Sequence, residues 1–98
     1  MANSNSPVLL SGEKTVTTAG TAEALAASQR VYSVLIIAKQ ANTGQVYVGG
    51  SDVDSDTNDG LDAGESITIQ ARNALDLADV YLDVDTDAEG VDFYAVKA

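Results

Sequence analysis

Residues 31–50 read VYSVLIIAKQANTGQVYVGG and decide the fold of this chain. Residues 31–38 are dense in β-branched and aromatic side chains, which favour an extended and packed backbone. The segment Asn42-Thr43-Gly44 follows, and Asn and Gly tolerate the positive φ angles of tight turns. Residues 45–49 then resume an extended pattern. We therefore predict a β-hairpin that pairs residues 31–39 with residues 45–49, and a core that forms around the first of these strands.

Further strands are expected on both sides of this hairpin. Residues 14–18 are rich in β-branched side chains, which favour a strand. Residues 65–70, 79–85 and 91–97 alternate between apolar and polar side chains with the period of a half-buried strand. Residues 22–30 are ambiguous between a short strand at 22–25 and one or two helical turns. Residues 71–78 are typical of a connection with a local turn.

About seven or eight short strands result, and this number predicts an all-β fold, a small antiparallel β-sandwich or barrel. Residues 11–98 would form this single domain, after a flexible N-terminal arm at residues 1–10. The expected core residues are Val16, Val34, Ile36, Val46, Val48, Ile67, Ile69, Val80, Leu82, Val91 and Phe93.

Residues 31–38 are apolar on both faces of the expected strand. One face should meet the opposing sheet, and the other is expected to meet a partner chain. Tyrosines on strands are most often packing or interface residues. The expected interface residues are Pro7, Val8, Leu9, Leu10, Tyr32 and Tyr47.

The charge is strongly acidic, with 15 acidic residues against 5 basic ones and a net charge of −10. DNA binding requires clustered Lys and Arg, so we expect no nucleic-acid partner. The chain has no His and no Cys, which removes the commonest general base and the thiol nucleophile. We therefore expect no enzymatic activity and no cofactor. No apolar run is long enough to cross a membrane, and the N-terminal residues lack the order of a signal peptide.

An acidic loop at residues 51–64, SDVDSDTNDGLDAG, is the one segment that could hold a metal ion. Asp54, Asp56, Asn58 and Glu65 have the spacing of positions 1, 3, 5 and 12 of a calcium-binding loop. The sixth position of that motif should be Gly, but here it is Asp59. We therefore expect a solvated loop without a metal, and keep calcium binding as the alternative.

A second acidic cluster, Asp83, Asp85, Asp87 and Asp92, lies near the C-terminus. The strand alternation directs these side chains toward water. A catalytic carboxyl pair needs burial to separate its two pKa values, so this cluster does not predict acid–base catalysis.

The order of these signals resembles that of small structural proteins of tailed bacteriophages, above all capsid decoration (cement) proteins. The resemblance covers residues 14–96. It depends on VYSV at 31–34, ANTGQVYVG at 41–49, LDAGESITI at 61–69, DLADVYLD at 76–83 and GVDFY at 90–94. The family usually has Pro where Ala63 stands.

The resemblance implies a jelly-roll-like β-sandwich on the outer capsid surface of a virion, made in the host cytoplasm. Its partners would be the major capsid protein and further copies of itself, as a trimer or a dimer. The N-terminal arm would become ordered on the capsid. The alternative is a head-fibre, tail or baseplate module that contacts the host surface.

Overall fold

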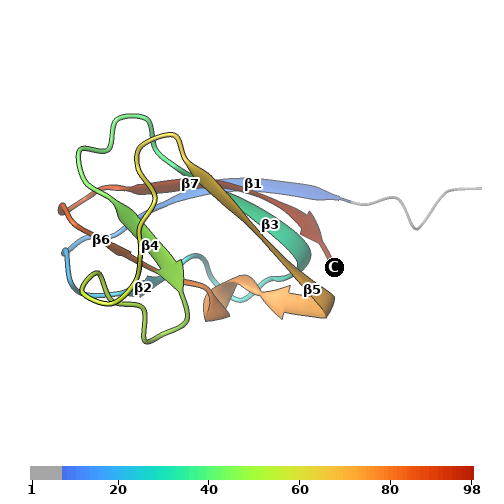
Figure 1. The fold of residues 1–98 in the computed structure, drawn as a ribbon. Helices are drawn as coiled ribbons and strands as arrows, with labels where there is room; N and C mark the ends of the chain where they lie inside the picture. Colours follow the sequence, from blue (N-terminus) through green and yellow to red (C-terminus); the bar gives the residue numbers. More distant parts are fainter. Residues whose placement is uncertain (1–7) are drawn as a thin grey trace, which may run out of the picture.

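The computed structural model describes residues 8–98, which form seven strands and one 3₁₀ turn (Figure 1). The elements are β1 (Leu9–Thr15), β2 (Glu23–Ala24), β3 (Arg30–Ala38), β4 (Val46–Gly49), β5 (Ser66–Asp76), η1 (Leu77–Asp79), β6 (Tyr81–Val84) and β7 (Gly90–Lys97). All strand pairs are antiparallel. The predicted all-β sandwich is confirmed.

Consecutive strands alternate between two sheets. Sheet A has the order β1-β7-β3-β5, and sheet B has the order β2-β6-β4. Every connection therefore crosses from one sheet to the other, and apolar side chains from both inner faces meet between the sheets. In an eight-stranded jelly roll the same alternation continues, except that the fifth strand lies beside the fourth at the edge of the second sheet.

A remnant of that fifth jelly-roll strand is present. Leu61 forms an isolated antiparallel bridge with Val46 of β4, through N–H to C=O hydrogen bonds of 3.0 and 2.7 Å. Leu61 thus lies at the edge of sheet B where a jelly roll would have a whole strand. The chain is a jelly-roll-like sandwich in which one edge strand is reduced to a single residue pair.

The predicted hairpin between residues 31–39 and 45–49 is wrong. β3 lies in the middle of sheet A between β7 and β5, whereas β4 lies at the edge of sheet B and pairs with β6. The turn near Asn42 is real, since the Asn42 N–H donates to the carbonyl of Lys39 at 3.1 Å. It reverses the chain between sheets rather than within one, because both partner edges of β3 are occupied by other strands.

The N-terminal expectations also need correction. The first strand is Leu9–Thr15 rather than residues 14–18, and Leu9 and Leu10 pair with Val96 and Ala95 of β7. The boundary placed between an arm at 1–10 and a domain at 11–98 is therefore wrong by at least these two residues. The rest of the expected arm, residues 1–7, lies outside the described residues. Gly12 lies within β1, where the Phe93 ring occupies the space of a side chain.

The core forms between the two sheets largely as expected. Eight of the eleven expected core residues are buried: Val16, Val34, Ile36, Val46, Val80, Leu82, Val91 and Phe93. Val48 and Ile69 pack only partly against the core, and Ile67 is 40% exposed, so its assignment to the core is wrong. Sheet A has one strand more than sheet B, and the inner face of its edge strand β5 is therefore incompletely covered.

Two further segments were ambiguous or misassigned in the sequence. Residues 22–30 contain the short strand β2, which is one of the two alternatives considered. Residues 71–78 are not simply a connection, because β5 continues to Asp76 and only then forms η1. The β3–β5 register moves from Ser33–Gln70 to Val31–Leu75, so residues 71–74 bulge out of the ladder.

Candidate interface

The outer face of sheet A is the candidate interface, and β-strand alternation determines its members. Residues adjacent to the buried Val34, Ile36, Phe93 and Ala95 point away from the core. The registers place them in three rows: Leu9, Val96, Ser33 and Gln70; Ser11, Tyr94, Leu35 and Thr68; Glu13, Asp92, Ile37 and Ser66. The first two rows are uncharged.

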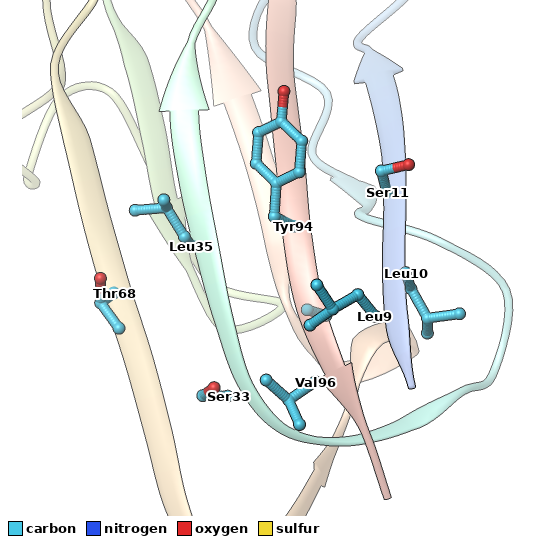
Figure 2. A pocket seen from close by; sticks show the side chains of 9 residues that line it. Leu9, Leu10, Ser11, Ser33, Leu35, Thr68, Tyr94 and Val96 are labelled. Carbon is cyan, nitrogen blue, oxygen red and sulfur yellow. The ribbon is translucent and has the colours of Figure 1, made fainter. Parts of the chain in front are cut away.

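An apolar groove runs over these two uncharged rows (Figure 2). It has a volume of about 450 Å³ and is lined mainly by Leu9, Leu35, Tyr94 and Val96, with Ser11, Ser33 and Thr68 at its sides. Leu9 is 76% exposed and Tyr94 is 51% exposed. Burying such side chains against a partner would be favourable at about 25 cal/mol per Å² of apolar surface removed from water.

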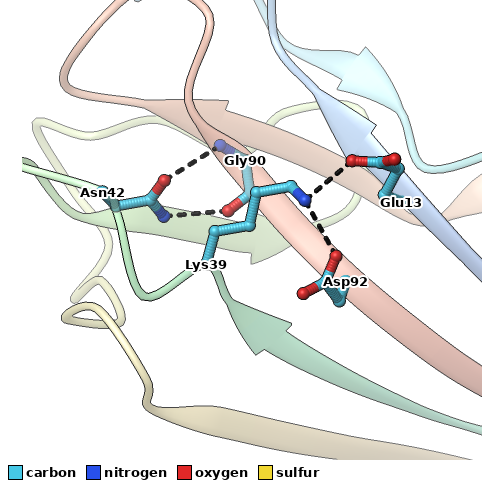
Figure 3. A network of polar contacts seen from close by, with 5 residues as sticks. All are labelled: Glu13, Lys39, Asn42, Gly90 and Asp92. Carbon is cyan, nitrogen blue, oxygen red and sulfur yellow. Dashed lines mark hydrogen bonds and ion pairs between the residues drawn. The ribbon is translucent and has the colours of Figure 1, made fainter.

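A cluster of ion pairs in the third row borders the uncharged part of the outer face of sheet A (Figure 3). The ammonium of Lys39 lies 2.7 Å from a carboxylate oxygen of Glu13 and 2.9 Å from one of Asp92. Hydrogen bonds to Glu13 and then Asp92 raise the pKa of Lys39 above its ordinary value. The cluster joins β1, β7 and the end of β3, and it offsets part of the negative charge beside the groove.

Five of the six residues expected at an interface divide into three groups, and Tyr47 is the sixth. Val8, Leu9 and Tyr32 are exposed, at 56%, 76% and 52%, and remain candidates. Leu10 is half-buried and packs against the core. Pro7 lies outside the described residues.

Tyr47 cannot serve as an interface residue, and that expectation is wrong. Its side chain is only 5% exposed. Its hydroxyl donates to the carboxylate of Asp85 at 3.0 Å. Burial, followed by the hydrogen bond to Asp85, raises the pKa of Tyr47. The residue therefore anchors β4 to the β6–β7 turn.

Two groove residues were not expected, Tyr94 and Val96, whereas Leu35 lies on the second apolar face of residues 31–38, which was expected to meet a partner chain. The sequence does carry a signal for Tyr94 and Val96, because both alternate with buried residues of the last strand. Their importance depends on the neighbours of β7, which are β1 and β3. Since that arrangement is non-local, the alternation by itself could not bring them together with Leu9.

The proposed calcium ligands do not converge. Asp54 accepts a hydrogen bond from the Asp56 N–H at 2.8 Å, and Asn58 accepts one from the Asp54 N–H at 3.0 Å. The carboxylate of Glu65 accepts a hydrogen bond from the N–H of Asp62 at 2.7 Å. Across residues 8–98, no three acidic side chains gather in a way that could hold a metal ion. The geometry therefore supports a loop stabilised by its own side chains.

Two carboxylates of the C-terminal acidic cluster accept hydrogen bonds from a loop, and the expectation that Asp83 points toward water is wrong. Asp83 is 3% exposed, and its carboxylate accepts from the N–H groups of Gly20 at 2.9 Å and Val84 at 2.8 Å. The loop between β1 and β2 covers it, which strand alternation alone does not reveal. Asp87 likewise binds the N–H of Ala19 at 2.7 Å.

Glu89 fastens the β3–β4 connection in the same way. Its carboxylate accepts from the N–H groups of Thr43 at 2.7 Å and Gly44 at 3.0 Å. The backbone N–H of Gly44, and then that of Thr43, hold the pKa of Glu89 below its ordinary value. These acids therefore act as acceptors for loop N–H groups, which explains part of the acidity without a catalytic role.

Comparison with protein-family models, curated proteins and solved structures found no match to this chain. Within residues 8–98 there is no helix with the length and hydropathy needed to cross a bilayer. The function therefore has to be inferred from the fold, the charge and the outer face of sheet A.

Proposed function

We propose that this chain is a structural protein of a tailed-bacteriophage virion that decorates the outer surface of the head. The observation that carries the proposal is the exposed apolar groove of Leu9, Leu35, Tyr94 and Val96 on an otherwise acidic domain. The jelly-roll-like sandwich supports it, since capsid domains commonly use this architecture. The resemblance of residues 14–96 to decoration proteins points the same way.

The charge distribution is consistent with binding outside the shell. A net charge of −10 opposes contact with packaged DNA. The acidic β6–β7 turn lies at the left end of the molecule in Figure 1, whereas the start of β1 and the C-terminus lie at the right end. The groove includes Leu9 at the start of β1 and Val96 near the end of β7. Docking through the groove would leave the acidic turn facing solvent.

The mechanism would be mechanical. The groove would bind the major capsid protein across a junction between capsomers, and each bound copy would add its binding free energy to the intact lattice. Many copies of modest affinity would together raise the barrier to rupture of the shell. No chemical step is required.

A second candidate is a head-fibre, tail or baseplate module that contacts the host surface. The exposed aromatic rings of Tyr32 and Tyr94 favour it, because aromatic side chains are common in recognition surfaces. The two candidates differ in copy number and location. A decoration protein would be present in many copies on the head, and a fibre or baseplate module in few copies on the tail.

The test uses virions purified from the cells that produce this chain. Quantitative mass spectrometry would give the copy number, and electron microscopy with a gold-labelled antibody would give the location. Addition of purified protein to undecorated heads would then compare wild type with Tyr94→Ser and with the control Ala63→Ser, at an exposed loop position. We expect loss of binding for Tyr94→Ser only; absence of the chain from virions would refute the proposal.

The N-terminal arm can be tested in the same assay. A deletion should remove residues 2–7 only, because Val8 accepts a hydrogen bond from Lys97 and Leu9 begins β1. We expect the shortened chain to fold and to bind heads more weakly. Unchanged affinity would show that residues 2–7 take no part in decoration.

A further inference from the structure

The free edge of β5 has the features of a strand that pairs with another chain. Among residues 8–98, which the structure describes, β5 is an outermost strand of sheet A, with β3 on one side only. Beside its start, the Ala38 N–H donates to Glu65 O and the Gly64 N–H donates to Ala38 O, both at 2.9 Å. Hydrogen-bond directions alternate along an antiparallel ladder, so Ile67 bonds toward β3. Ser66, Thr68 and Gln70 therefore direct their N–H and C=O groups to the open edge.

This edge lacks the protection that natural sheets give their edge strands, which is charge, proline or very short length. Residues 66–71, SITIQA, contain no charged residue and no proline in a chain with 15 acidic residues. The opposite edge of sheet A is β1, which carries Glu13 and Lys14. In sheet B, β2 has only two residues, and β4 is partly covered by Leu61.

An apolar side chain of β5 is also exposed to solvent beside this edge. Ile67 projects from the inner face of β5 and is 40% exposed, although it pairs with the fully buried Ile36. A strand added beside β5 would cover Ile67 and satisfy the unpaired backbone groups together. The two observations are independent, since one concerns the side chains and the other the main chain.

We propose that a second copy of this chain pairs with β5 antiparallel, around a twofold axis at Thr68, and joins the two copies of sheet A into one continuous sheet. The sequence of the strand is self-complementary about that point. Thr68 faces Thr68 of the second copy, Ser66 faces Gln70, and Ile67 faces Ile69. The residues that would form hydrogen bonds across the axis are Ser66, Thr68 and Gln70, whose N–H and C=O groups point to the open edge of β5.

Side-chain pairing favours a second copy as the occupant. In this register Ile69 of one copy lies directly across from the exposed Ile67 of the other, on the same inner face, and this contact occurs twice by symmetry. No like charges face each other across the axis, because residues 66–70 are uncharged. Isologous twofold contacts are the commonest way in which identical chains associate. The resemblance to decoration proteins implies contacts between copies of this chain, and the dimer proposed here is tested on the protein alone, without virions.

The first experiment measures self-association by sedimentation equilibrium. Thr68→Pro removes an N–H that points to the open edge and leaves the β3 ladder intact. Two symmetry-related hydrogen bonds are lost, and each is worth a factor of about five in the association constant, so we expect association to weaken about twenty-five-fold. The matched control is Ser11→Pro. The Lys97 N–H donates to Val8 O, so Val8 bonds toward β7, and by the alternation of the β1–β7 ladder the Ser11 N–H points to the outer edge of β1. We expect Ser11→Pro to associate like wild type.

The second experiment tests the register and does not depend on Thr68→Pro folding. The chain has no Cys, so single cysteines report contacts without background. Facing residues of a hydrogen-bonded antiparallel pair have Cα atoms about 5.5 Å apart, within disulfide range. On oxidation, Thr68→Cys should cross-link to itself, whereas Ser66→Cys and Gln70→Cys should cross-link only when mixed.

The result that overturns the proposal is a wild-type chain that stays monomeric up to about 1 mM, the range of the weakest specific contacts. A dimer that survives Thr68→Pro, or one lost equally in Ser11→Pro, would also overturn it. So would Thr68→Cys cross-linking no faster than Ser11→Cys. A strand from a different protein at this edge would give the monomeric result.

Discussion

Gly90→Ala should destabilise the fold severely, because there is no space for a methyl group where β7 begins. A Cβ atom at Gly90 would lie 1.9 Å from the carbonyl oxygen of Lys14 and 2.7 Å from the Cα of Thr15. Both neighbours are backbone atoms of β1, so no side-chain rotation relieves the clash. The two strands would have to separate by about 1 Å or more at this pair.

The magnitude follows from the contacts that this separation strains. Overpacking in a dense interior costs about 1–3 kcal/mol. The Gly90 carbonyl also accepts from the Lys39 N–H at 3.1 Å and from the Asn42 side-chain amide at 2.8 Å (Figure 3). Loss of one of these bonds adds about 1 kcal/mol. The total of about 2–4 kcal/mol is a large part of the about 5–15 kcal/mol that stabilises a typical domain.

The assays are urea unfolding and thermal unfolding at neutral pH, both followed by circular dichroism because the chain has no Trp. A melting temperature about 10–30 °C below wild type is expected for a domain of this size. The control is Gly50→Ala, where a Cβ would meet only the flexible Asp52 carboxylate at 3.3 Å. We expect the control to stay within about 0.5 kcal/mol of wild type. If Gly90→Ala also does so, the close approach of β1 and β7 described here is incorrect.

Three further predictions concern the acidic residues and their partners. Glu23, Asp76 and Glu89 have pKa values below their ordinary range, because an ammonium, a hydroxyl and a backbone N–H, respectively, bind their charged forms. The stability that these three charged carboxylates add to the fold is complete above the ordinary carboxyl range of about pH 4, and it is lost as the pH falls through their lower folded pKa values. The urea midpoint of the wild type should therefore drop in acid. Glu89→Gln should lessen this drop, because one of the three carboxylates is then absent. Asp83→Ala should cost about 1–3 kcal/mol by leaving loop N–H groups unpaired, with faster amide exchange at Gly20; unchanged exchange would contradict this. Tyr47→Phe should lower the free energy of urea unfolding by about 1 kcal/mol and remove a tyrosine whose pKa is raised above its ordinary value; a titration curve equal to that of wild type would count against the burial of its hydroxyl.

The apolar alternation predicted the strands and the core well. Val34 and Ile36, Leu82, and Val91 and Phe93 are buried as expected, and residues 81–84 and 90–97 form strands. A period of two in hydrophobicity is a local property that survives in any sheet packed on one face. The all-β class followed directly from it.

The candidate interface was predicted only in part. Leu9 and Tyr32 are exposed as expected, but Tyr47 is buried and Tyr94 was not selected. Alternation identifies which side of a strand a residue occupies. It does not identify which strands lie beside it, and the groove exists only because β1, β7 and β3 are neighbours.

The amino-acid sequence by itself determined that this chain is an acidic, all-β domain without His or Cys. Only the tertiary structure decided that β3 and β4 lie in different sheets, that Asp83 is buried under a loop, and that β5 is an open edge. The physical reason is that hydrophobic patterning acts within a strand, whereas pairing depends on contacts between segments far apart in the chain. A turn such as that at residues 42–44 reverses the chain equally well within one sheet or between two.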